Sequence, residues 1–194
     1  GEEMTYLRDV IEKAGSGAWV IDTGVLGPPG FEADTSREAV PGPGGSSLEE
    51  RIAKRDRGQA MEVMSRGAAA LVRELFTSSQ IDGIIAAGGP ANTTIGAAAM
   101  QSLPIGFPKV LVSTLASGDV SGWVGTRDIT MMYSVVDIAG INRISAAILR
   151  NAANAVSSMA AGKREVESSR PLIAASMFGV TTPCVTEAVS YTQP

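Results

Sequence analysis

Two loops rich in glycine and in hydroxyl side chains follow short apolar runs, and they are the parts of this sequence best suited to chemistry. The apolar run at residues 81–87 leads into a loop at 88–94, and the run at 110–112 leads into a loop at 113–119. Apolar runs of this length are typical of buried parallel strands. Since open α/β sheets bind ligands at the carboxyl ends of their strands, the two loops predict one binding crevice.

The residue types of both loops suit a phosphate group. Glycine lets the backbone approach a phosphate, hydroxyl groups add hydrogen-bond donors, and a helix start adds partial positive charge. The loops match neither the Gly-x-Gly-x-x-Gly pattern nor the P-loop, so tight turns and helix caps remain an equally good interpretation. The candidate ligands are Gly88, Gly89, Thr93, Thr94, Ser113, Thr114, Ser117 and Gly118, with Asp119 for a ribose hydroxyl or a hydrated Mg²⁺.

Other chemically capable residues have simpler explanations. Arg127 has the reach to contact a phosphate, with Asp128 to orient it, but a surface ion pair between the two is the more common outcome. Cys184 is a candidate nucleophile, although a small buried residue at a helix start is more common. Met131, Met132, Tyr133 and Trp123 are interpreted as core or interface residues.

Composition excludes several classes of function. The net charge of −4 argues against a nucleic-acid partner, because contact with many phosphates requires clustered Lys and Arg. The chain has no histidine, which excludes Ser-His-Asp and Cys-His catalysis within it. A single cysteine excludes an intrachain disulfide and favours the cytoplasm. No apolar stretch reaches the roughly 20 residues that a membrane span needs.

The elements that position the loops follow from hydrophobic periodicity. Ser47 and Glu50 form a capping box at the start of the second helix, after a glycine- and proline-rich loop. The alternation of helices and strands predicts an α/β fold with a mainly parallel sheet. We expect helices over residues 2–14, 48–76, 93–100 and 137–161, and strands over residues 18–22, 81–87, 109–112, 129–133 and 171–176.

Three stretches of this sequence closely resemble one family. They read LPIGFPKV over residues 103–110, VSTLASGDV over 112–120 and DITMMYSVVDIAGINRIS over 128–145. The family is that of the tomato mosaic virus resistance protein, an uncharacterised protein family (0261) whose members are called ATP-binding-domain proteins. The resemblance covers nearly the whole chain. It implies a Rossmann-like three-layer sandwich, ATP binding at a crevice formed by both loops, and a homodimer.

The resemblance also divides the chain. It implies a nucleotide-binding subdomain over residues 1–162, a charged linker over 163–170 and the start of a second α/β subdomain over 171–194. Family members usually open with a strand followed by Asp-Thr-Lys-Gly-Glu-Glu, and Gly1 aligns with the glycine of that pattern. The resemblance therefore implies a central strand before Gly1, with its loop facing the crevice.

The first loop departs from the family pattern. Where the family has Gly-Gly-Ser-Gly-Gly-Thr, this chain has Gly-Gly-Pro-Ala-Asn-Thr over residues 88–93. Pro90 lacks an amide donor and Ala91 does not readily adopt a positive φ, whereas Asn92 does and so is kept among the candidate ligands. These differences predict that ATP binding is weaker than in the family or lost. The second loop retains the family pattern.

Three functions are compatible with this pattern. The first is an ATP-binding domain without catalysis of its own, and the second is a protein-interaction module that has lost its ligand. The third is the non-catalytic part of a hydrolase or lyase whose barrel lies elsewhere. The retained loop at 113–119 favours the first function, and Pro90 and Ala91 favour the second.

Overall fold

The computed structural model describes residues 1–24, 30–40, 57–162 and 179–192, which fall in two compact units, Gly1–Lys163 and Arg164–Pro194. The second unit includes a 3₁₀ turn, Gly179–Thr181, and helix α7 (Thr182–Thr192). The first unit holds the sheet. Its elements are α1 (Glu2–Lys13), α3 (Arg57–Thr77), β1 (Ile84–Gly88), α4 (Pro90–Gln101), β2 (Lys109–Ser113), α5 (Ser121–Val124), β3 (Thr130–Tyr133) and α6 (Arg143–Ala161).

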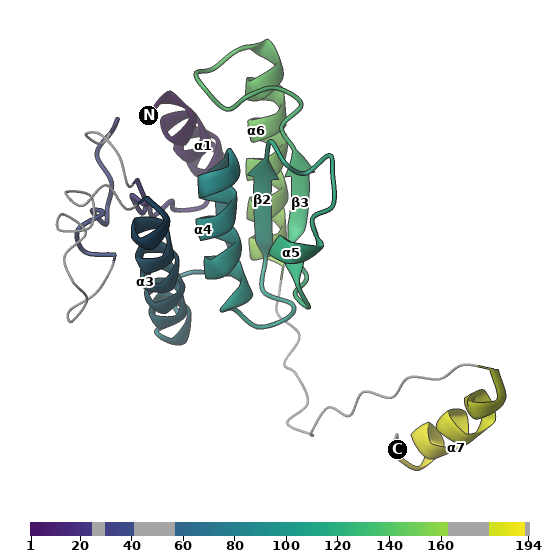
Figure 1. Cartoon of the computed structure of the whole chain (residues 1–194). Coiled ribbons are helices and arrows are strands. Elements are labelled where there is room, and N and C mark those ends of the chain that lie inside the picture. Colours follow the sequence, from purple (N-terminus) through teal and green to yellow (C-terminus); the bar gives the residue numbers. More distant parts are fainter. Residues whose placement is uncertain (25–29, 41–56, 163–178, 193–194) are drawn as a thin grey trace. The chain divides into compact units, whose positions relative to one another are not determined.

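The three strands form one parallel sheet in the order β1-β2-β3. In Figure 1, α4 lies to the left of β2, and α6 lies behind β2 and β3. Hydrophobic residues on α3 and α4 pack with β1 on one face, while α1 and α6 pack with the other face. The structure thus confirms the predicted α/β class and has the layering of a Rossmann-like sandwich. Among the described helices, none is long and apolar enough to cross a bilayer.

Short apolar strands need apolar cover on both faces, and the central strand, β2, has it. All five residues of β2 are buried. Val110 and Val112 pack in the core with α6, and Leu111 packs on the opposite face with Met100 of α4. A β-carbon on Gly96 would lie 2.8 Å from the β-carbon of Ala86, so glycine at this position is what allows α4 to pack closely on β1.

The predicted strand at 18–22 is wrong. Ile21 forms one isolated bridge with Thr35, and Trp19 is 52% exposed, with its ring nitrogen donating to the Thr35 hydroxyl. The apolar pattern is present, but the segment has no neighbouring strand to extend the pairing within the described residues. Its extended backbone instead pairs with residues 34–35.

Several predicted boundaries move by a few residues. Helix α4 begins at Pro90 because proline suits a first helical position, where no amide donor is required. Helix α6 begins at Arg143, because Oδ1 of Asn142 caps it by accepting from the amide of Ser145, while the hydroxyl oxygen of Ser145 accepts from the amide of Asn142. Cys184 is exposed, so the expectation that it is buried is wrong. The capping box at residues 47–50 and the strand predicted at 171–176 lie outside the described residues.

Candidate phosphate-binding loops

The two glycine- and hydroxyl-rich loops lie side by side at the carboxyl edge of the sheet. Because β1 and β2 are parallel and pair Gly88 with Ser113, the loops that follow them leave the sheet at the same edge. The amide of Thr114 donates to the carbonyl of Gly88 at 3.3 Å, which extends the pairing into the loops. The two loops that were predicted to line one crevice are therefore neighbours in the structure.

A buried pair of hydroxyl groups fastens the two loops together. The hydroxyl oxygens of Thr93 and Ser113 are 2.7 Å apart, and both residues are fully buried. Thr93 also donates to the Gly89 carbonyl at 2.9 Å, and Ser113 accepts from the amide of Leu115 at 3.0 Å. These two predicted ligands thus serve as internal supports for the loops, because their hydroxyls have protein partners and lie away from solvent.

Helix α4 starts at this edge without a side chain to cap it. Gly89 is its N-cap residue, and Pro90 occupies the first turn. The amides of the first helical turn have no acceptor within a helix, so Ala91 and Asn92 offer donors toward the crevice. Both residues are helical, and neither is among the described residues with positive φ. The departure at Ala91 therefore does not cost the backbone conformation that the sequence argument assumed.

The remaining hydroxyls of the first loop are held by neighbours. Thr94 donates to the Pro90 carbonyl at 3.0 Å and accepts from the ring nitrogen of Trp123 at 3.4 Å. The side-chain amide of Asn92 reaches the Ala87 carbonyl at 3.5 Å. Glycine is required at position 88, since a β-carbon there would lie 2.5 Å from the β-carbon of Asn92.

The second loop presents its polar groups to solvent. Ser117, Gly118 and Asp119 are exposed, and Thr114 is half-buried. The Asp119 carboxylate accepts from the amide of Ser121 at 2.9 Å, and this hydrogen bond lowers the pKa of Asp119 below its usual range. Asp119 is thus ionised at neutral pH and lies at the start of α5, where the hydroxyl of Ser121 also hydrogen-bonds to its carboxylate.

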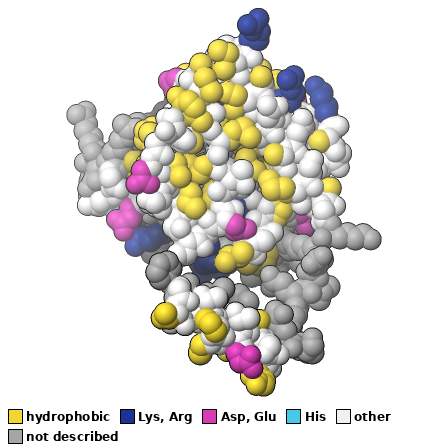
Figure 2. Space-filling view, turned by 90° about the vertical axis from the view of Figure 1, so that its right-hand side faces the viewer, with side chains coloured by type: hydrophobic (Ala, Val, Ile, Leu, Met, Phe, Trp, Pro, Cys, Tyr) yellow, Lys and Arg dark blue, Asp and Glu magenta, His cyan; other side chains and the backbone are white. Residues whose placement is uncertain are grey.

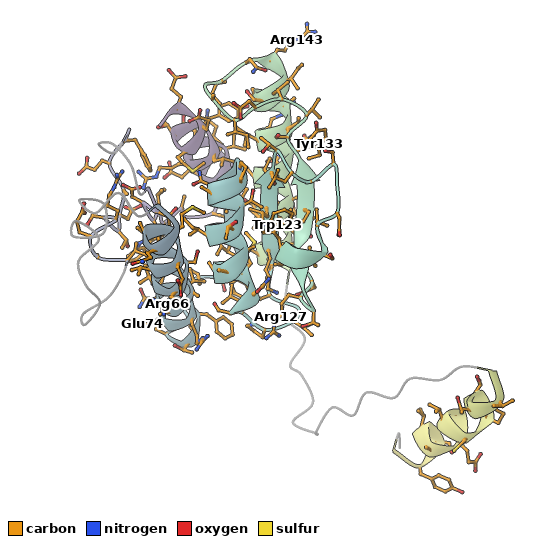
Figure 3. The ribbon with its side chains drawn as sticks, in the orientation of Figure 1. Arg66, Glu74, Trp123, Arg127, Tyr133 and Arg143 are labelled. Atoms are coloured by element: carbon orange, nitrogen blue, oxygen red, sulfur yellow. The ribbon has the colours of Figure 1, made fainter. Side chains whose placement is uncertain are left out.

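Arg127 is not brought to these loops. It precedes β3, whereas the loops follow β1 and β2, so it lies at the amino edge of the parallel sheet, as Figure 3 shows. The expected ion pair between Arg127 and Asp128 also differs from what the structure shows. Asp128 accepts from Nζ of Lys109 at 2.7 Å, and the Lys109 side chain is 0% exposed.

The sequence did not predict two features of the loop that follows β3, which lies at the same carboxyl edge of the sheet. The carboxylate of Glu3, in the first turn of α1, accepts from the amide of Gly140 in the loop after β3. Burial raises the pKa of Glu3, but hydrogen bonds from its own backbone and from Gly140 outweigh burial and lower it. Val135, in the same loop, has a φ of +64° at the centre of a γ-turn closed by Val136 and Ser134. No local pattern signals either contact.

A cavity of about 940 Å³ runs along the free edge of β1. The amide of Ile84 donates to the carbonyl of Pro108, on the side of β2. Because backbone groups point to opposite sides at successive residues of a strand, those of Gly83, Ile85 and Ala87 face the cavity. Its far side is the extended segment 18–24. The walls above and below are apolar and come from both layers of helices, namely Leu7, Ile11, Val72, Leu75, Ile95, Ala99 and Val156.

Comparison with known proteins places this fold in a family. Residues 1–165 match the N-terminal domain of the uncharacterised protein family UPF0261. A UPF0261 protein of Clostridium tetani is 50% identical over 192 residues, which are 98% of this chain and 48% of that protein. One of Rhizobium meliloti is 44% identical over 191 residues, which are 97% of this chain and 46% of that protein.

A plant protein is also similar. The ToMV resistance protein Tm-1(GCR237) of Solanum lycopersicum is 38% identical over 135 residues, which are 66% of this chain and 18% of that protein. These matches confirm the resemblance inferred from residues 103–145. The chain spans about half the length of the bacterial relatives that it matches.

Proposed function

The chain belongs to the uncharacterised protein family UPF0261, and we propose that its first unit binds ATP at the carboxyl edge of its parallel sheet. One observation carries this proposal. The two glycine- and hydroxyl-rich loops are held together by the hydrogen bond between the hydroxyl groups of Thr93 and Ser113. At the same edge of the sheet, α4 starts without a side-chain cap, so its first amides are available to a phosphate. In open α/β sheets this edge is where ligands bind.

The proposed contacts come from the groups that remain available at this edge. The amides of Ala91 and Asn92 at the start of α4 face the phosphates on one side, and Gly89 leaves room for them. Thr114, Ser117 and the Gly118 amide form the other side. Asp119 holds a ribose hydroxyl or the hydrated Mg²⁺ that accompanies the phosphates. Thr93 and Ser113 position the loops without touching the ligand, and Arg127 takes no part.

The proposal includes the opening strand that the family resemblance implies. The cavity beside β1 supports it, because the outward backbone groups of Ile85 and Ala87 match a parallel partner and the walls are apolar above and below. A strand in this cavity would end beside Gly88 and add a third loop to the crevice. The proposed compartment is the cytoplasm, where the single cysteine needs no disulfide partner.

Isothermal titration with ATP and Mg²⁺ tests the function, with a Gly89→Val variant to test the site. A β-carbon on Gly89 has Thr114 Oγ1, at 3.9 Å, as its nearest neighbour, so the variant should fold while its side chain fills the space for phosphate. We expect ATP to bind the unchanged protein and to raise its unfolding temperature. Gly89→Val should bind at least about 100-fold more weakly, with the unfolding temperature unchanged when ATP is absent.

A matched control is Gly17→Val, since a β-carbon on Gly17 meets no atom within 4 Å and Gly17 belongs to neither loop. Its ATP affinity should stay the same. No heat and no thermal shift at millimolar ATP would refute ATP binding and favour an interaction module instead. Binding that Gly89→Val leaves intact would move the site away from these loops.

A further inference from the structure

The chemical character of the carboxyl edge changes from one strand to the next. After β1 come the glycines of the first loop and the uncapped first turn of α4. After β2 come the hydroxyl groups of the second loop and the carboxylate of Asp119. At the end of β3, Tyr133 is 42% exposed, and Val135, two residues later, is 56% exposed. The edge therefore runs from amide donors, through hydroxyl and carboxylate groups, to apolar side chains.

Tyr133 lies beside the second loop and on the same face of the sheet as α4. The register pairs Tyr133 with Ser113, from which the second loop leaves β2. Because side chains alternate between the two faces of a sheet, Tyr133 shares a face with Met131, which packs with residues of α4 and α5. On this face the hydroxyl of Ser113 also meets Thr93 of α4. Figure 3 shows Tyr133 at the upper end of β3.

Val135 keeps its side chain in solvent although its backbone conformation is unfavourable. Its φ of +64° lies in the left-handed region, which a β-branched residue rarely adopts. A γ-turn, closed by the amide of Val136 and the carbonyl of Ser134, holds it there. Strained residues of this kind gather at ligand sites. Figure 2 shows the side of the molecule that carries β3, with hydrophobic side chains gathered over its upper part, where the strand ends.

We propose that the base of the nucleotide lies against Tyr133 and Val135. This inference rests on the ATP binding proposed above, and it places the ribose at Asp119 and the phosphates at the start of α4. Neighbouring strands are about 4.8 Å apart, so the three positions follow one another at about one strand spacing. Their order along the edge is the order in which phosphate, ribose and base are joined in a nucleotide.

The nature of the apolar side chains indicates the class of ligand. A tyrosine ring stacks on the face of a nucleobase, and a purine offers it the larger surface. The exposed side chains adjoin the polar loops along one edge, which is the arrangement that a nucleotide requires and that a protein partner does not. The geometry thus points to a purine nucleoside triphosphate that lies across the ends of all three strands.

Isothermal titration tests the position of the base by comparing ATP with inorganic tripolyphosphate, each with Mg²⁺. The unchanged protein should bind ATP at least about tenfold more tightly, because only ATP has a base to stack. Tyr133→Ala should weaken ATP binding about tenfold and leave tripolyphosphate binding unchanged, whereas Tyr133→Phe should retain both affinities. The control is Ile105→Ala, since Ile105 is 60% exposed and precedes β2, at the other edge of the sheet. It should change neither affinity.

Val135→Gly provides a second test that damage to the fold cannot mimic. Glycine adopts a positive φ without strain, so the variant should unfold at a higher temperature than the unchanged protein when no ligand is present. It should nevertheless bind ATP at least about threefold more weakly, because it loses an apolar contact.

The outcomes separate the position of the base from ATP binding itself. Equal affinity for ATP and tripolyphosphate would overturn the position of the base and leave the phosphate site in place. The same conclusion would follow if Tyr133→Ala weakened both ligands equally, or if it kept the full preference for ATP. Failure of both ligands to bind the unchanged protein would refute the proposed function, and the position of the base with it.

Discussion

Removing the carboxylate of Asp128 should destabilise the protein more than removing the lysine that it pairs with. Nζ of Lys109 donates to Asp128 Oδ1 at 2.7 Å and to the carbonyls of Pro104 and Phe107 at 2.7 and 3.0 Å. The side chain of Lys109 is 0% exposed, whereas that of Asp128 is 41% exposed. Water can therefore solvate the carboxylate when its partner is lost, but it cannot solvate the ammonium.

The expected magnitudes follow from this asymmetry. Asp128→Asn leaves a buried ammonium without its counter-charge, which should cost about 3 kcal/mol, the lower end of the range for broken buried ion pairs. Lys109→Met keeps the apolar stem and leaves two carbonyls without a donor, which should cost about 1–2 kcal/mol. The double variant has no buried charge, so it should be more stable than Asp128→Asn alone by about 1 kcal/mol.

Urea unfolding, followed by circular dichroism, measures the stability of the unchanged protein, of the two single variants and of the double variant. The slope of the unfolding free energy against urea concentration should be the same in all four proteins, so that the transition midpoints report their stabilities. If Lys109→Met is the less stable single variant, the buried ammonium does not control this site. The same conclusion follows if the double variant is no more stable than Asp128→Asn.

The pH dependence provides a second check on Asp128. Burial raises its pKa, but hydrogen bonds from Lys109 and from the Gly106 amide outweigh burial, and the pKa lies below its ordinary value of 3.8. A lowered folded-state pKa contributes stability that is present above pH 3.8 and is lost as the pH falls through the folded value. Asp128→Asn should therefore lose less stability than the unchanged protein over this acidic range.

Three other outcomes test the structure around the crevice. Gly88→Ala should lower stability by about 1–3 kcal/mol in thermal unfolding, because its β-carbon would collide with Asn92, and an unchanged protein would contradict the loop geometry. Asn142→Ala should cost about 1 kcal/mol through loss of the α6 cap, and a loss that Asn142→Ser does not largely restore would contradict the capping role. When the opening strand that we propose is added before Gly1, amide exchange at Ile85 and Ala87 should slow at least about tenfold, while amides bonded to β2 stay unchanged. Equal slowing at all β1 amides would indicate general stabilisation and contradict strand addition.

Local patterns predicted the elements whose neighbours are also local. Strand β2 was predicted over residues 109–112 and spans Lys109–Ser113, since an apolar run between turns identifies a buried strand. The spacing of three and four residues between Met4, Leu7 and Ile11 identified α1, and Leu7 and Ile11 are buried in the core. The adjacency of the two loops also followed, because parallel strands in one sheet leave their loops at one edge.

What could not be predicted depends on distant partners. Nothing near Lys109 in the sequence identifies Asp128 as its partner, and the neighbouring Arg127 is the more obvious choice. The buried hydroxyls of Thr93 and Ser113 belong to the same residue types as exposed ligands, so only their packing separates support from contact. Pro90 is the exception, since its preference for a first helical position is a local signal that marks the start of α4.

The two edges of the sheet differ in a way that decides what each can accept. The free edge of β1 lies between helices on both faces, so a partner there must be apolar on both sides and must enter the core along its length. The free edge of β3 is exposed at Thr130 and Tyr133, so a partner there needs only one apolar face and can dissociate without opening the core. An added strand at β1 should therefore contribute to folding and to the proposed crevice, whereas a group that contacts the β3 edge should leave the fold intact.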